Sequence, residues 1–174
     1  MVTGASRGIG AAIAQRLSDS GIIVILAARD KKKMKENTQY FTNEYSVVQT
    51  DVRDEKSVID LVNYVYKKYS KVDILVNNAG YVEPLSLLEM SKEIWDNTLS
   101  SNITGTFLMT REVVRYMKKD GGKIINIAST AGLSPRPGWS AYAASKAAVI
   151  SFSLTMAEEL RDFNIKVYPV CPGR

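Results

Sequence analysis

The chain contains no histidine and a single cysteine, Cys171, among its 174 residues. A Ser-His-Asp hydrolase is excluded, because the imidazole base that activates its serine is missing. One thiol without histidine partners cannot build a zinc centre, so no metal site is predicted. A lone cysteine also rules out a disulfide within the chain, which is typical of a reducing compartment. We therefore expect a cytoplasmic protein.

Long apolar runs, repeats and low-complexity tracts are also missing. No stretch approaches the roughly 18 apolar residues of a membrane span, so no membrane association is predicted. The first residues do not resemble a secretory signal. With 45% hydrophobic and 24% charged residues, the composition is that of an ordinary globular protein. The length favours one domain over residues 1–174.

The net charge of +5 is modest. The densest basic cluster, Lys31 to Lys33 with Lys35, lies beside acidic residues at the start of a predicted helix. Such a cluster is typical of a solvated surface, so nucleic-acid binding is not expected. The charge is also compatible with an anionic cofactor.

Apolar runs of strand length alternate with segments of helical period. The runs read as strands buried on both faces, and the intervening segments as amphipathic helices. This alternation predicts parallel βαβ units and an α/β fold, a doubly wound parallel sheet of the Rossmann type in three αβα layers. The predicted strands are Ile22 to Ala28, Ser46 to Thr50, Ile74 to Asn77, Lys123 to Ala128 and Lys166 to Cys171, and the longest predicted helices are Lys92 to Lys118 and Ser140 to Arg161.

Residues of unusual type follow directly on the predicted strands. In a doubly wound sheet ligands bind at the carboxyl ends of the strands, so these residues predict the site. A further strand, central in the sheet, should precede the glycine-rich loop, yet just Met1 and Val2 stand there, and the sequence stops soon after the last strand. We expect truncation at both ends. The strand-end residues are Gly4 to Gly10, Arg29, Asp51, Asn78 to Gly80, Ser129 and Pro172 with Gly173.

A TGxxxGxG loop, Thr3 to Gly10, opens the first predicted helix. Gly4 suits a tight turn with positive φ, Gly8 lets the backbone approach a pyrophosphate, and Gly10 allows close packing of helix and strand. The helix start would then offer free N–H groups to the phosphates. A plain tight turn is the alternative interpretation of the glycines alone.

The end of the second predicted strand indicates which dinucleotide is bound. An acidic residue there would hold the ribose 2′-hydroxyl of NAD, but the strand ends in Ala28 and is followed by Arg29. Arg29 and Arg7 suit a 2′-phosphate, because the guanidinium fork matches phosphate oxygens. NADP(H) is the preferred cofactor and NAD(H) the alternative, in which Arg29 is a surface residue and Asp30 binds the ribose.

Tyr142 and Lys146 form a YxxxK pattern, which chance also produces at Tyr64 and Lys68. Residues four apart lie on one face of a helix, so the lysine ammonium can favour the phenolate form of the tyrosine. Tyr142 is then a candidate general acid or base. The Tyr64 pair lies near the polar end of a helix, which indicates an exposed face, whereas Tyr142 lies in an alanine-rich helix after a strand and a loop.

Taken together, these motifs resemble the compact, single-domain short-chain dehydrogenases/reductases. The matches extend along the whole chain in the right order, including the thirteen residues from Ser129 to Tyr142. They are the TGASRGIG loop, Asp51-Val52, Asn77-Asn78-Ala79-Gly80, Ser101-Asn102, Ile127-Ala128-Ser129, Tyr142-Lys146 and Pro172-Gly173.

The resemblance implies hydride transfer between a nicotinamide and a ketone or secondary alcohol. Tyr142 would exchange a proton with the substrate oxygen and Ser129 would position that oxygen. Lys146 would assist the tyrosine and bind the nicotinamide ribose, and Asn102, at a helix irregularity, would hold a water linked to Lys146. The cofactor-binding residues implied are Gly4, Ser6, Arg7, Gly8, Ile9, Gly10, Arg29, Asp51, Val52, Asn78, Ala79, Gly80, Tyr142, Lys146, Pro172 and Gly173.

Structural alternatives remain for several of these residues. Ser129 and Asp51 are also plausible helix caps, and Asn102 a surface amide. The segment Asn77 to Gly80 also reads as a turn after a strand. In the loop from Leu133 to Trp139, which includes Arg136, the tryptophan either lines an apolar pocket or packs beneath the loop.

For the substrate, the resemblance favours a carbonyl reductase, with 3-oxoacyl groups on acyl carrier protein as the commonest case. An alcohol, polyol or steroid dehydrogenase is the second choice, and a non-catalytic dinucleotide sensor is the rival from another class. Basic residues at 111, 115, 118 and 119 either receive an acidic carrier protein or form a solvated helix face. The long helices resemble those that pair subunits in the family, so a homodimer or homotetramer is expected.

Overall fold

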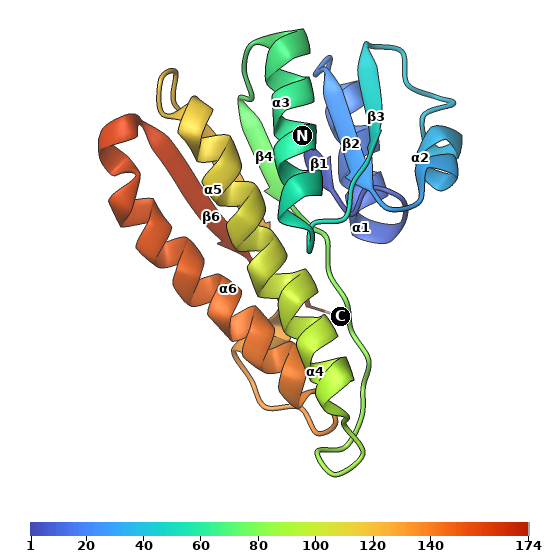
Figure 1. Cartoon of the computed structure of the whole chain (residues 1–174), viewed down its shortest axis with the longest axis vertical. Helices are drawn as coiled ribbons and strands as arrows, with labels where there is room; N and C mark the ends of the chain where they lie inside the picture. The colour runs from blue at the N-terminus through green and yellow to red at the C-terminus, as the bar shows by residue number, and fades with distance from the viewer. Residues whose placement is uncertain (174) are drawn as a thin grey trace.

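A computed structural model of the chain describes residues 1–173. Its six strands form one parallel sheet in the order β3-β2-β1-β4-β5-β6 (Figure 1). This is the predicted doubly wound α/β sheet, and the strand before the glycine loop is central in it. The strands are β1 (Val2–Thr3), β2 (Val24–Ala28), β3 (Tyr45–Gln49), β4 (Ile74–Asn77), β5 (Gly122–Ile127) and β6 (Ile165–Val170).

Helices cover both faces of the sheet, which gives the three predicted layers. Alternate residues of a strand point to opposite faces, so Ile25 and Ala27 of β2 face one apolar core and Val24 and Leu26 the other. Helices α3, α5 and α6 pack on the first face, and α1 and α2 on the second. Figure 1 shows α5 and α6 side by side at the β6 end. The helices are α1 (Gly8–Asp19), α2 (Lys31–Asn37), α3 (Glu55–Tyr69), α4 (Lys92–Leu99), α5 (Gly105–Met117) and α6 (Ser140–Glu159).

The helical stretch predicted from Lys92 to Lys118 is interrupted in the structure. A π-helical turn, η1 (Ser100–Thr104), separates α4 from α5 and carries Asn102. This is the helix irregularity that the resemblance implied, and such π-turns occur frequently at functional sites. Gly105 follows it in close contact with Val52, because a Cβ on Gly105 would lie 2.7 Å from Val52 Cγ2.

Smaller differences lie at element ends. The strand expected from Ile22 begins at Val24, because Ile22 and Ile23 are 36% and 44% exposed and lie before the sheet. The helix expected to reach Arg161 ends at Glu159 and is followed by a 3₁₀ turn, η3 (Arg161–Phe163). None of the helices in the described part of the chain is both long and apolar enough to cross a bilayer.

Four buried polar side chains connect four elements through the core. Asn77 of β4 donates to Thr110 of α5 at 3.0 Å and to Asn126 of β5 at 2.9 Å. The Asn126 amide donates in turn to Ser153 of α6 at 2.8 Å. Each of the four is at most 3% exposed. We call this set the polar chain; it fixes β4 and β5 relative to the two helices that pack on them.

Candidate active site

The glycine loop between β1 and α1 has the backbone that its sequence predicts. Gly4 and Gly8 have φ values of 62° and 57°, a region that favours glycine. A Cβ on Gly4 would lie 2.8 Å from Ala79 Cα, whereas one on Gly8 would meet nothing within 4 Å. Gly4 is therefore required by packing against the end of β4, and Gly8 leaves its surface open to a ligand.

The start of α1 fits an anionic group. Arg7 is its N-cap and makes no side-chain capping hydrogen bond within the described chain. Free N–H groups in a first helical turn, together with the helix dipole, bind phosphate groups well. The pyrophosphate of a dinucleotide therefore fits this loop.

Residues from two other segments of the chain hold the loop in place. Asn78 donates from its side-chain amide to the Thr3 carbonyl at 3.0 Å, and its backbone N–H donates to Thr3 Oγ1 at 3.0 Å. From the last turn of α2, Asn37 donates to the carbonyl of Ser6 at 2.9 Å. Asn78 is thus more than a turn residue. The hydrogen bonds by which Thr3 and Asn37 hold the loop were not predicted from the sequence.

At the end of β2, the position expected to contact the ribose is Ala28 and not an acidic residue, and an arginine follows it. Arg29 is exposed there, and Arg7 is exposed in the loop. Asp30, the alternative ribose ligand, caps α2 by accepting from Lys33 N–H at 2.9 Å. Asp51 does not cap the following helix, a position that Asp54 occupies. It pairs instead with Arg53 at 2.7 Å, and the hydrogen bond from that guanidinium holds the pKa of the Asp51 carboxyl below its usual range.

A cavity of about 340 Å³ opens at the carboxyl ends of the strands. It brings together Tyr142, Lys146, Ser129 and residues predicted to bind the cofactor, and we call it the site cavity. Its lining is Ile9, Asn78, Gly80, Tyr81, Val82, Ile127, Ala128, Ser129, Thr130, Arg136, Trp139, Tyr142, Lys146, Pro172 and Gly173. The other predicted residues lie in the glycine loop, at neighbouring strand ends or, for Asn102, behind Gly80 and Tyr81.

Lys146 is buried beneath Tyr142 on the first turns of α6. Its Nζ lies 5.6 Å from the centre of the Tyr142 ring and donates to the carbonyl of Ile127 at 2.6 Å. Burial lowers the pKa of the Lys146 ammonium to about 8, and the nearby Cys171 opposes that shift. A lysine in this state exchanges its proton near neutral pH while remaining beside the tyrosine.

Ser129 stands in extended backbone two residues after the end of β5. Its Oγ accepts a hydrogen bond from Ala131 N–H at 3.1 Å and so caps a 3₁₀ turn, η2 (Thr130–Gly132). The capping alternative is therefore correct, but it does not exclude the functional role. A hydroxyl that accepts one hydrogen bond keeps its own proton to donate, and Ser129 also lines the site cavity.

Asn102 is 1% exposed, so its interpretation as a surface amide is wrong. Its Oδ1 accepts from Tyr81 N–H at 2.7 Å, and its Nδ2 donates to the Tyr81 carbonyl at 3.0 Å and to Ser145 Oγ at 2.8 Å. The π-turn thereby fixes the chain where it leaves β4 and joins it to α6, one residue before Lys146. Tyr81 had no sequence signal that could have identified it.

The loop before α6 forms the outer wall of the site cavity. Trp139 packs edge-on against Tyr142 with ring centres 5.4 Å apart, and the Arg136 guanidinium lies 4.7 Å from the Trp139 ring centre. Both interpretations of Trp139 therefore hold, since it lines the cavity and packs against its neighbours. On the facing segment, Leu85 N–H donates to the Gly138 carbonyl at 2.9 Å.

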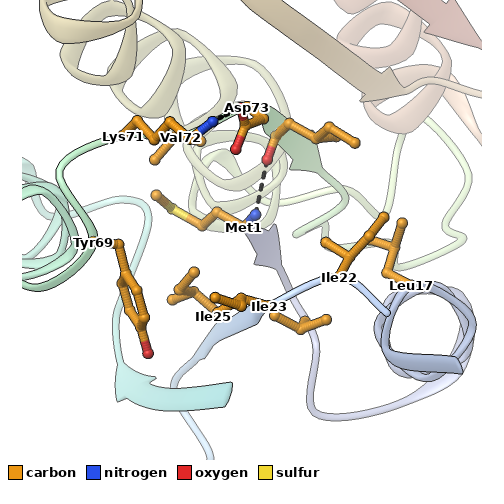
Figure 2. Close-up of a pocket in the computed structure, with 11 residues that line it drawn as sticks. Met1, Leu17, Ile22, Ile23, Ile25, Tyr69, Lys71, Val72 and Asp73 are labelled. Carbon is orange, nitrogen blue, oxygen red and sulfur yellow. Dashed lines mark hydrogen bonds and ion pairs between the residues drawn. The ribbon is translucent and has the colours of Figure 1, made fainter. Parts of the chain in front are cut away.

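A second cavity, of about 320 Å³, lies at the opposite ends of the strands. Figure 2 shows its mostly apolar lining around Met1, Ile25 and Val72, with an ion pair between Lys71 and Asp73. The nitrogen of Met1 donates to the Ile74 carbonyl at 2.8 Å. The glycine loop and Tyr142 lie at the carboxyl ends of the strands, so this second cavity is not the candidate active site.

Comparison with known proteins gives a consistent picture. A 3-oxoacyl-(acyl-carrier-protein) reductase FabG of Aquifex aeolicus is 36% identical over 99% of this chain and 72% of its own length. A 3-oxoacyl-(acyl-carrier-protein) reductase of Synechocystis is 39% identical over the same shares.

Solved structures agree in fold. A short chain dehydrogenase from Mycobacterium smegmatis matches with a TM-score of 0.95 and 30% identity over 99% of this chain and 75% of its own. A variant actinorhodin polyketide ketoreductase solved with NADPH matches with a TM-score of 0.95 and 35% identity over 99% of this chain and 68% of its own. The short chain dehydrogenase family model matches residues 1–174. The chain therefore belongs to the short-chain dehydrogenase/reductase family and is an oxidoreductase that acts on CH–OH or keto groups.

Proposed function

We propose that this protein is an NADP(H)-dependent reductase of ketones, with Tyr142 as the group that exchanges a proton with the substrate oxygen. One observation carries the proposal. Tyr142, Lys146 and Ser129 all line the site cavity, which lies beside the open surface of the glycine loop. When bound, the dinucleotide supplies the hydride, and the protein supplies geometry and a proton.

The residues of the loop and strand ends would hold the dinucleotide. The N–H groups at the start of α1 would bind the pyrophosphate, with Gly8 giving the close approach. Gly80, Pro172 and Gly173 line the cavity, as Ile9 does, and would border the nicotinamide end. Asp51 and Val52, at the end of β3, would face the adenine.

A preference for NADP(H) over NAD(H) rests on the cations at the end of β2. Arg29 is exposed there and Arg7 is exposed in the glycine loop, while Asp30 is engaged as a helix cap. A guanidinium recognises a 2′-phosphate through paired hydrogen bonds that a 2′-hydroxyl cannot offer. The neighbouring ketoreductase structure that contains NADPH agrees with this preference.

Proton transfer would use the buried lysine as well as the tyrosine. Lys146 as an ammonium favours the phenolate that Tyr142 becomes when it gives its proton to the substrate oxygen. Ser129 keeps a hydroxyl proton with which to bind that oxygen. Asn102 would act through Tyr81 and Ser145, and a water between its side chain and Lys146 would return the proton from solvent.

For the substrate we propose a 3-oxoacyl group, because several relatives are 3-oxoacyl-(acyl-carrier-protein) reductases. On α5, two of the basic residues that could receive an acidic carrier protein are already paired, Arg111 with Glu55 and Arg115 with Glu112. Lys118 and Lys119 remain exposed beside them. A cytoplasmic location fits this reaction and the one free thiol, Cys171.

The test compares the chain with its Tyr142→Phe variant in reducing a panel of ketones and 3-oxoacyl thioesters. Turnover should fall by at least about 100-fold, the usual contribution of a general acid, while dinucleotide affinity stays within twofold. Catalytic efficiency (kcat/KM) with NADPH should exceed that with NADH by about tenfold or more.

The matched control is Tyr64→Phe, which removes the tyrosine of the second YxxxK match on the outer face of α3 and should retain turnover. A Tyr142→Phe variant that keeps turnover contradicts the proton-transfer role. Efficiency with NADH equal to or above that with NADPH contradicts the cofactor preference. Tight dinucleotide binding without turnover of any ketone would instead indicate a dinucleotide sensor.

A further inference from the structure

Arg136 lines the site cavity, and its guanidinium is held against a neighbouring ring. It lies 4.7 Å from the ring centre of Trp139, a distance at which a cation is attracted to an aromatic face. Trp139 in turn contacts the ring of Tyr142, with 5.4 Å between ring centres. The cation is therefore linked to the proton-transfer tyrosine through a single intervening side chain.

The loop that carries Arg136 is held at its far end. Gly138 has a φ of 75°, a turn conformation suited to glycine, and its carbonyl accepts from Leu85 N–H at 2.9 Å. Trp139 N–H donates to the Arg136 carbonyl at 3.2 Å and closes the turn. Backbone and ring contacts together restrict where the guanidinium can point.

The charge of the site cavity is positive. Its lining contains two cations, Arg136 and Lys146, and no carboxylate. Lys146 donates to the Ile127 carbonyl, and Arg136 forms no ion pair within residues 1–173. On the facing segment, the Glu83 carboxylate accepts a hydrogen bond from the Tyr81 hydroxyl.

We propose that Arg136 is a specificity-determining residue that binds an anionic group of the substrate, a carboxylate or a phosphate carried on the same molecule as the ketone. Arginine offers two parallel N–H donors to such a group, and its planar fork can bind the anion while stacked on Trp139. Among small free ketones of the same size, the cavity thus selects those that carry an anionic group. The ketone in this inference rests on the proposed function, whereas the anion recognition does not.

The kinetic experiment uses the full chain and a homologous series of oxo acids, with the methyl ester of each as its neutral match. A ketone carrying a phosphate monoester tests the second source of charge. Arg136→Gln should raise KM for the charged substrates by about tenfold or more, leave kcat within twofold, and leave the esters unaffected. Arg136→Lys should restore part of the affinity, because it keeps the charge without the fork.

Arg115→Gln on α5 is the matched control, since it removes an arginine whose guanidinium pairs with Glu112 outside the site cavity. An equal loss with acids and esters in Arg136→Gln would show a structural role and overturn the proposal. Equal efficiency of the unmodified chain with acid and ester would overturn it as well. The better of the carboxylate and phosphate arms identifies which anion the site takes.

A binding measurement separates this inference from the reaction. In a Trp95→Phe background Trp139 is the remaining tryptophan, and its fluorescence can be titrated with each oxo acid and each ester. Tighter binding of the acid that disappears in Arg136→Gln supports the anion site even if no ketone is reduced. Equal binding of acid and ester excludes it, whatever the turnover.

Discussion

At the scale of single residues, Lys146 connects burial with reactivity. It is 4% exposed, its charge is balanced by a backbone carbonyl rather than a carboxylate, and burial lowers its pKa to about 8. An ordinary lysine titrates near 10.4 and would stay charged across the whole working range. Here the ammonium beneath Tyr142 is lost only slightly above neutral pH.

We expect kcat/KM for ketone reduction to fall as the pH rises through about 8. The reason is that Lys146, with its lowered pKa, loses its ammonium proton above that value. The profile of kcat/KM against pH, which reports groups of the free enzyme, measures this directly. A profile that stays flat to about pH 10 would show that Lys146 keeps an ordinary lysine pKa in the folded protein.

The sequence could indicate those residues whose identity is demanded by local chemistry. Gly4 and Gly8 could be predicted because their φ values favour glycine, and Tyr142 because its spacing to Lys146 and Ser129 is fixed along the chain. Tyr81 could not, since it contributes backbone groups that any residue possesses. Asn37 was missed for another reason: its partner, the Ser6 carbonyl, is 31 residues away and is met only in the folded protein.

At the scale of elements, the polar chain joins β5, which precedes Ser129, to α6, which carries Tyr142. Ser129 follows β5, and Tyr142 lies in the first turn of α6, so their separation depends on how that strand and helix are fixed. The bond between Asn126 and Ser153 joins the same two elements inside the core. Apolar packing alone would tolerate sliding of the helix more readily than a directional hydrogen bond does.

Ser153→Ala should therefore lower the free energy of unfolding by about 1–3 kcal/mol, because it leaves the buried Asn126 amide without its acceptor. Urea denaturation followed by circular dichroism measures the change. Ser151→Ala, at an exposed position of the same helix, is the control and should stay within about 0.5 kcal/mol. Equal stability of the two variants would remove the polar chain as a structural element.

The sequence predicted helices and strands accurately where the spacing of apolar residues determines the element, and poorly at the ends of elements. The runs at β4 and β5 were placed to within a residue because they are buried on both faces. Ile22 and Ile23 were assigned to a strand by hydrophobicity, yet they lie before the sheet and stay partly exposed. The break at η1 leaves no trace in the apolar period, and only the family resemblance indicated it.

At the scale of the whole molecule, the α4–α6 side carries apolar side chains that the chain itself leaves exposed. Trp95 of α4, Phe107 of α5 and Leu154 of α6 are 37%, 39% and 57% exposed, and Phe107 packs edge-on against Phe152. We propose that these helices pair subunits into a homodimer or homotetramer, because burying such side chains is favourable.

Size-exclusion chromatography with light scattering at micromolar concentration should show the oligomer. Leu154→Glu should shift the protein towards monomer, because it places a charge at the proposed contact. Leu88→Glu is the control, since Leu88 is 97% exposed but lies in the loop before α4, and it should leave the assembly unchanged. A monomer in the unmodified chain, or the same shift in both variants, would contradict this assembly.

The attachment of the loop from Leu133 to Trp139 has a consequence for how such a molecule can change over generations. A backbone hydrogen bond from Leu85 to Gly138 joins the loop to the facing segment, and this bond does not depend on the side chain at Leu85. Lys146, Asn102 and the polar chain are buried in the core. If Arg136 selects the substrate as proposed, substitutions in this loop would change which molecules the site cavity admits while these buried groups stay unaltered.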